Sequence, residues 1–99
     1  MTAAIDRAEA DAIARGEHGD PFAVLGMHHV GDAIVVRAFL PQARRVHVVD
    51  RRSGQNLAEL PRMFHDGLFA GVVADRKRRF AYHLRLETAA GDVEIEDPY

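Results

Sequence analysis

Residues 80–87, Phe-Ala-Tyr-His-Leu-Arg-Leu-Glu, carry the clearest structural signal in the chain. Large apolar side chains occupy every second position from Phe80 to Leu86, and polar ones such as His83 and Arg85 lie between them. Successive side chains of a β-strand point to opposite faces of a sheet. The alternation therefore predicts a strand with one face in the core and the other in water.

The same period of two extends outward from this segment. Further strands are predicted over 33–40, 46–50, 56–60, 68–74 and 93–96, with turn residues such as Asp66-Gly67 between them. This spacing predicts an all-β fold, a small immunoglobulin-like antiparallel β-sandwich. The expected core consists of inward apolar residues: Val36, Leu40, Val48, Leu68, Val72, Tyr82, Leu84, Leu86 and Val93.

The N-terminal part has a different period. Ile5, Ala8, Ala12 and Ile13 fall on one helical stripe, and Gly16 suits a helix end. We therefore expect a short helix over 1–16, followed by a single β-sandwich module over 17–99. Glycines and a proline punctuate residues 17–31, which are predicted to form a loop. Because this loop is rich in apolar side chains, it is expected to pack onto the core rather than to act as a free linker.

Composition excludes several classes of function. The 99 residues include no cysteine and no tryptophan, and the formal net charge is −2. Disulfides and thiolate metal sites are therefore impossible, and a dedicated nucleic-acid binder would be more basic. No apolar run approaches the roughly 20 residues of a membrane-spanning helix, and the N-terminus lacks the pattern of an export signal. We expect a cytoplasmic location, with neither nucleic acid nor membrane as partner.

No catalytic or cofactor motif stands out. The single serine, Ser53, lies in a turn outside any nucleophile motif, and the glycines lack the spacing of a phosphate-binding loop. Acidic residues fall on the predicted helix and on the exposed side of the last strand, where solvated charges are usual. The six histidines are scattered, and the adjacent His28 and His29 would point to opposite faces of a strand. We expect no catalytic residue, no metal site and no cofactor.

Residues 76–79, Arg-Lys-Arg-Arg, form the one dense run of charge. Such a run could meet phosphate or an acidic partner. Alternatively, it is a turn between two apolar strands that cations keep soluble. The turn is the better interpretation, because the sequence shows no further basic segment that would extend the run into a groove.

The chain also resembles a known family. The block Asp20-Pro21-Phe22-Ala23-Val24-Leu25-Gly26-Met27-His28 resembles the opening of bacterial 1,4-α-glucan (glycogen) branching enzymes. The resemblance continues, in the same order, through Val36–Ala43, Val46–Asp50, Gly67–Gly71, Tyr82–Arg85 and Glu96–Tyr99. It implies the N-terminal, first β-sandwich domain of such an enzyme. The second sandwich of the family continues into a tryptophan-containing stretch that this chain lacks.

The resemblance implies a place in a larger enzyme rather than an active site. Branching enzymes are glycosyltransferases that transfer α-1,4-glucan segments to form α-1,6 branches, and their catalytic carboxylates lie in an α-amylase-type barrel. The implied function is a non-catalytic accessory domain that helps to position the glucan or the barrel. Its partners would be the following β-sandwich, the barrel and, weakly, the α-glucan. The alternatives are a purely structural packing domain and a protein-interaction module.

Two sets of residues are candidates for these roles. Sugar faces stack on aromatic rings, so carbohydrate contact is expected to use rings with arginine or histidine neighbours. Core packing is the alternative use of the same rings, because they lie in predicted strands. An exposed apolar patch in the 17–31 loop would instead favour docking to another domain. The carbohydrate candidates are Phe69, Phe80 and Tyr82, and the docking candidates are Phe22, Leu25 and Met27.

Overall fold

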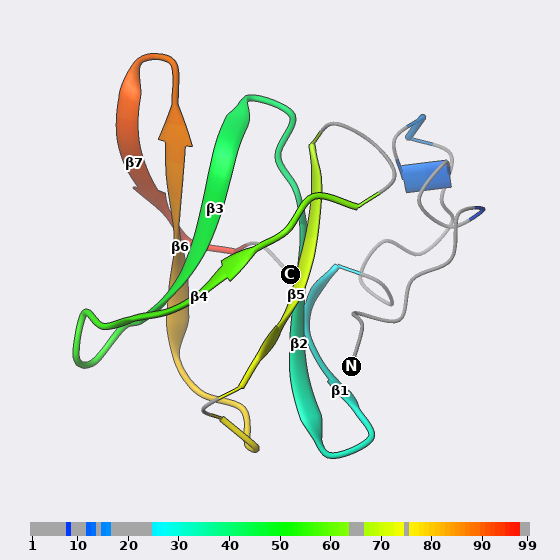
Figure 1. Ribbon diagram of the computed structural model, residues 1–99, viewed down its shortest axis with the longest axis vertical. Coiled ribbons are helices and arrows are strands. Elements are labelled where there is room, and N and C mark those ends of the chain that lie inside the picture. Colours follow the sequence, from blue (N-terminus) through cyan, green and yellow to red (C-terminus); the bar gives the residue numbers. More distant parts are fainter. Residues whose placement is uncertain are drawn as a thin grey trace.

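The computed structural model describes residues 8, 12, 13, 15, 16, 25–63, 67–74 and 76–97. Within these residues the chain forms seven strands in two antiparallel sheets, so the predicted all-β sandwich is confirmed (Figure 1). The strands are β1 (Gly26–Val30), β2 (Ala33–Phe39), β3 (Ala43–Asp50), β4 (Asn56–Leu60), β5 (Leu68–Val73), β6 (Tyr82–Thr88) and β7 (Gly91–Ile95).

The two sheets are joined along one side. One sheet has the order β1-β2-β5 and the other β4-β3-β6-β7. Just after β4 the chain pairs with β5: the Ala70 amide donates to the Pro61 carbonyl at 3.0 Å, and the Met63 amide donates to the Leu68 carbonyl at 2.9 Å. We call this the closed side. Among the described strands, β1 is the other edge of the three-stranded sheet and β7 is the other edge of the four-stranded sheet. We call the side that these two edges form the open side.

The core lies between the sheets and matches most of the predicted inward positions. Val36, Val48, Leu84 and Leu86 are at most 2% exposed and pack in one cluster. Leu40 and Tyr82 pack against that cluster while partly buried. The inward residues of both sheets interdigitate there, as in other sandwiches.

Three positions of the predicted core differ from this pattern. Leu68 is fully buried and Val72 partly buried, but both belong to clusters outside the main core. Val93 is 47% exposed, so its assignment to the core is wrong. It pairs with Leu86 on the inward side of β7, but β7 is an edge strand that lies away from the three-stranded sheet (Figure 1). The alternation therefore indicates correctly which face of the sheet Val93 lies on, but it does not indicate whether another strand packs over that face.

The predicted 17–31 loop contains a strand. Its last third is β1, which pairs with β2 through the two-residue turn Gly31-Asp32. The adjacent histidines and flanking glycines concealed this strand, because they interrupt an apolar alternation. Leu25, next to β1, is buried with Ile13 and Leu68, so at this point the segment does pack onto the sheets.

The predicted N-terminal helix falls mostly outside the described residues. Five positions within 1–16 are described, and among them Ile13 is 8% exposed and its carbonyl accepts the Gly16 amide at 3.1 Å. The helix over 1–16, and the boundary at residue 17, stay predictions. No helix in the described part of the chain has the length and apolar character needed to cross a membrane.

Candidate functional site

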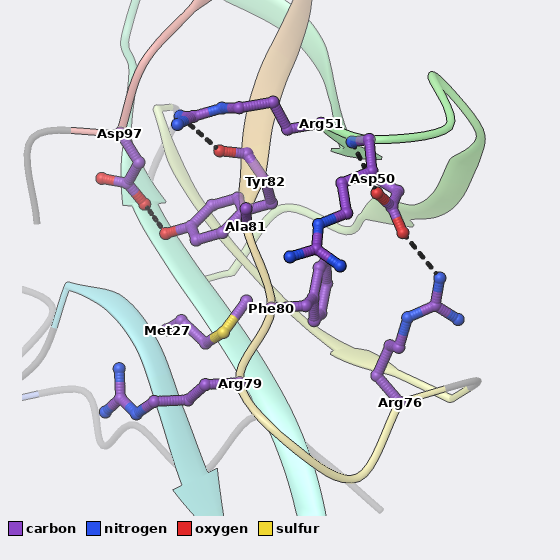
Figure 2. Close-up of a pocket in the computed structure, with 10 residues that line it drawn as sticks. Met27, Asp50, Arg51, Arg76, Arg79, Phe80, Ala81, Tyr82 and Asp97 are labelled. Carbon is purple, nitrogen blue, oxygen red and sulfur yellow. Dashed lines mark hydrogen bonds and ion pairs between the residues drawn. The ribbon is translucent and has the colours of Figure 1, made fainter.

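The surface is hollowed at the end of the sandwich where β3 and β7 finish and β6 begins. The hollow has a volume of about 740 Å³, within the range of about 300–1,000 Å³ that is usual for small-molecule sites. Residues of β1, β3 and β6, and of the segments that follow β3, β5 and β7, line it (Figure 2). Its lining consists of Met27, Asp50, Arg51, Arg52, Arg76, Arg79, Phe80, Ala81, Tyr82 and Asp97.

Asp50 shapes the turn that follows β3. Its Oδ1 accepts the backbone amides of Arg52 at 2.8 Å and Ser53 at 3.3 Å, which is the usual way an aspartate closes a turn on itself. The Arg51 amide then donates to the Ala81 carbonyl at 3.1 Å. This bond holds the turn after β3 against the segment that leads into β6.

The other oxygen of Asp50 binds across the hollow. Its Oδ2 accepts a hydrogen bond from Arg76 at 2.8 Å, and the same guanidinium lies over the Phe80 ring at 5.3 Å from the ring centre. The Arg76 hydrogen bond, followed by the Arg52 amide, lowers the pKa of Asp50 below the ordinary value. Asp50 is therefore an ionised carboxylate at neutral pH and has no proton to donate to a leaving group.

Tyr82 forms the second aromatic face of the hollow. Its ring is half-buried, its centre lies 6.0 Å from that of Phe80, and the two planes are tilted by 59°. Its hydroxyl donates to Asp97, and its carbonyl accepts from Arg51 at 3.0 Å. Burial first, and then the Asp97 hydrogen bond, raise the pKa of Tyr82, while the charge of Arg79 acts in the opposite direction. Tyr82 is a neutral phenol at any physiological pH.

The lining carries an excess of positive charge, with four arginines against two aspartates. One arginine is neutralised by Asp50, as described above, and Arg51 donates to Glu96. No carboxylate of the described residues lies within ion-pair distance of the guanidinium groups of Arg52 or Arg79. Both of these side chains are exposed.

This clustering changes the interpretation of the basic run over 76–79. In the sequence the run has no basic neighbour, and a solubilising turn explains it well. In the structure, Arg51 and Arg52 come from the separate turn after β3 and line the same hollow as Arg76 and Arg79. Contact between two turns that are distant in the sequence supplies the second basic segment, and no local pattern could have predicted it.

The predicted carbohydrate-binding residues divide into two groups. Phe80 and Tyr82 line the hollow, and both are partly exposed. Phe69 is 1% exposed and belongs to the main core. Its buried ring has no face available to a sugar, which corrects its inclusion among the candidates. The reason is its place on β5 at the closed side, where the segment after β4 pairs with it and Arg62 lies over its ring.

The predicted docking residues do not form an exposed apolar patch in the part that the structure describes. Leu25 and Met27 are 3% and 5% exposed, and Phe22 lies outside the described residues. Met27 instead packs in the main core and contributes to the lining of the hollow. Burial of these two side chains removes the observation that would have favoured docking over sugar binding.

Each of the two histidines in the four-stranded sheet pairs with a side chain of a neighbouring strand. His47 lies 2.5 Å from a carboxylate oxygen of Glu87 and 3.0 Å from the side-chain nitrogen of Asn56. His83 pairs with Glu94. Among the described residues, no three histidine or acidic side chains gather in a way that could hold a metal ion.

Comparison with known proteins identifies the family. A family model described as the N-terminal domain of the alpha-1,4-glucan branching enzyme GlgB matches residues 6–99. The chain belongs to this family. The resemblance seen in the sequence is thereby confirmed.

Two curated relatives are branching enzymes. The chain is 42% identical over 95 residues to the 1,4-alpha-glucan branching enzyme GlgB of Roseobacter denitrificans, and the match covers 96% of this chain and 13% of the relative. It is 46% identical over 91 residues to the enzyme of the same name from Nitrobacter hamburgensis, with coverage of 92% and 12%. The chain thus spans about an eighth of the length of these relatives.

A solved structure shares the fold. The crystal structure of apo pullulanase from Paenibacillus barengoltzii superposes with a TM-score of 0.59 at 19% sequence identity. The match covers 90% of this chain and 16% of the pullulanase chain. At this level of identity, the likeness concerns the fold alone.

Proposed function

We propose that the chain is a non-catalytic accessory domain of a glycogen branching enzyme, and that its hollow holds part of the glucan. The observation that carries this proposal is the pair of partly exposed rings, Phe80 and Tyr82, among hydrogen-bonding side chains. Sugar rings pack their apolar faces on aromatic side chains, while their hydroxyls need polar partners. Asp97 and the arginines of the hollow supply such partners.

The state of the carboxylates supports a non-catalytic role. Glycoside chemistry of the usual kind needs two carboxyl groups that flank the bond, one of them protonated. Asp50 is held ionised by Arg76, and Asp97 accepts the hydroxyl of Tyr82. We therefore assign bond breaking and transfer to another part of the parent enzyme, the barrel expected after this domain and a second sandwich.

Contact between the hollow and the glucan would affect how the glucan is bound and oriented rather than how its bonds are broken. A rigid domain that holds a remote part of a long polymer contributes to binding and orientation at the reacting end. Both rings are half-buried, so the stacking area is small. We expect millimolar affinity, worth about 4 kcal/mol.

The test is a deletion in the parent enzyme. Removal of Met1–Tyr99 is expected to leave branching activity measurable and to shift the lengths of the transferred chains. A short oligosaccharide substrate that cannot span both sites should be processed at an unchanged rate. Loss of all activity in a truncated enzyme that calorimetry shows to be folded would contradict the proposal.

A purely structural role is the second candidate, and Val93 favours it. This residue is 47% exposed on the edge strand β7, where a neighbouring domain could cover it. If the deletion only lowers the melting temperature and leaves the branch lengths unchanged, the structural role is correct and glucan positioning is not.

A further inference from the structure

A continuous row of contacts runs along the hollow from one carboxylate to another (Figure 2). Asp50 accepts a hydrogen bond from Arg76 at 2.8 Å, and the Arg76 guanidinium lies over the Phe80 ring at 5.3 Å from the ring centre. The Phe80 ring lies 6.0 Å, centre to centre, from the ring of Tyr82, whose hydroxyl donates to Asp97. Each ring is therefore tied to a carboxylate: Tyr82 directly, and Phe80 through Arg76.

The anchor of Arg76 comes from a distant part of the chain. Asp50 ends β3, and its second oxygen accepts two backbone amides of the turn that follows. Arg76 lies after β5, where its own amide donates to the Val73 carbonyl at 3.3 Å. The side chains of Arg76 and Asp50 are 31% and 14% exposed, so solvent screens this ion pair less than a fully exposed one. The guanidinium over the ring is thus held at both ends of its side chain.

The Phe80 ring needs such support if it is to contact a sugar. It precedes β6 and is only partly buried, so core packing restrains it less than it restrains the buried ring of Phe69. A guanidinium is attracted to the face of an aromatic ring, and a ring that is oriented before the ligand arrives loses less entropy on binding. A sugar cannot stack on the face that Arg76 covers. Arg76 therefore also determines which part of the ring a sugar can reach.

We propose that Arg76 is a positioning residue of the hollow: held by Asp50, it keeps the Phe80 ring in the orientation in which this ring contacts the glucan. The proposal rests on the proposed sugar-binding function of the same hollow. In this role Arg76 acts through Phe80 rather than through a contact of its own with the sugar. Loss of the Asp50 anchor should therefore have the same effect as loss of the Arg76 guanidinium.

The orientation of the ring is measured on the labelled chain without ligand. The nuclear Overhauser effect between the rings of Phe80 and Tyr82 reports how closely they pack. Arg76→Gln should weaken this effect, whereas Arg76→Lys should retain it, because lysine keeps a cation that can contact both Asp50 and the ring. An effect of full strength in Arg76→Gln overturns the positioning role and leaves the proposed function intact.

Titration with maltoheptaose, followed by the amide shifts of the same variants, measures the consequence for the glucan. Arg76→Gln should bind about fivefold more weakly than the unmodified chain, and Arg76→Lys should stay within about twofold. Arg62→Gln is the matched control, because Arg62 lies over the ring of Phe69 and outside the lining of the hollow. Its affinity should be unchanged, and circular dichroism establishes that all variants fold. An equal loss in Arg62→Gln would show a general effect on the fold and would overturn the assignment.

Asp50→Asn separates positioning from direct contact with the sugar. The asparagine oxygen can still accept the turn amides, but the charge that holds Arg76 is lost. If Arg76 positions the ring, Asp50→Asn weakens the binding of maltoheptaose, and Arg76→Gln in the same chain causes no further loss. If Arg76 binds the sugar itself, Arg76→Gln lowers the affinity while Asp50→Asn leaves it intact, and this result overturns the proposal. Absence of binding by the unmodified chain contradicts the proposed function, and the positioning role with it.

Discussion

Two arginine–phenylalanine pairs show that the same kind of contact can lie in the core or at an accessible surface, depending on what packs around the ring. Arg62 lies 5.7 Å from the centre of the Phe69 ring, and Arg76 lies 5.3 Å from that of Phe80. The local geometry is nearly the same, yet Phe69 is 1% exposed in the core, whereas Phe80 is partly exposed in the hollow. At the closed side the ring packs between the sheets, and at the end of the sandwich the second ring remains accessible.

The largest expected effect is on stability at the closed side. Phe69→Ala should lower the free energy of unfolding by about 3–5 kcal/mol, because it leaves a cavity in a fully packed region. Phe80→Ala should cost about half as much, since its ring is only partly buried. Urea unfolding of both variants measures the difference. Equal losses of unfolding free energy would show that the two rings are buried to the same extent.

Gly67 gives the next largest effect. Its φ is +104°, and a Cβ there would lie 2.7 Å from the Cα of Pro41. Gly67→Ala should therefore cost at least about 2 kcal/mol, more than an ordinary strained turn position. Gly31→Ala is the matched control, because its φ is +61° and a Cβ would meet nothing within 4 Å. A cost for Gly67→Ala no greater than that of the control would disprove the close approach to Pro41.

Substitution of Tyr82 tests the hydrogen bond that its hydroxyl donates to Asp97 at the hollow. Tyr82→Phe should cost about 1 kcal/mol through loss of the bond to Asp97. Because the pKa of Tyr82 is raised in the folded state, its contribution is complete below pH 10.0 and is lost as the pH rises above that value. Absorbance titration of the Tyr99→Phe variant, in which Tyr82 is the remaining tyrosine, follows the phenol; ionisation near pH 10.0 in the folded chain would contradict the raised pKa.

The smallest expected effect concerns the ion pair of Asp50 with Arg76. Asp50 has a lowered pKa, so its contribution to stability is present above the ordinary value of 3.8 and disappears as the pH falls below it. Asp50→Asn should be less stable than the unmodified chain at pH 7, and the gap should close in acid. A gap that does not change with pH would show that the turn hydrogen bonds, rather than the charge, carry the effect.

The local sequence pattern predicts the strands well where one face is buried and the other is exposed to solvent. Alternation placed β6 and located Leu84 and Leu86 in the core. It missed β1, whose adjacent histidines break the period. It also placed Val93 inside, because alternation identifies a face but not the strands that cover it.

The hollow was only partly predictable for the same reason. Phe80 and Tyr82 were candidates from their residue type, but so was the buried Phe69. Arg52 and Arg79 line the same hollow because the pairing of β3 with β6 brings together the segment after β3 and the segment before β6. Contacts between distant segments follow from the topology, which no single stretch of sequence contains.

A nuclear magnetic resonance titration of the labelled chain with unmodified maltoheptaose measures whether the hollow is the glucan-facing surface. The amide shifts of Arg51, Ala81 and Tyr82 should move together and saturate with a millimolar dissociation constant, about 4 kcal/mol. Phe80→Ala should weaken these shifts, while Val93→Ala, on the uncovered edge strand, should leave them unchanged. Shifts confined to β7, or no change at the hollow, would contradict its assignment as the site of glucan contact.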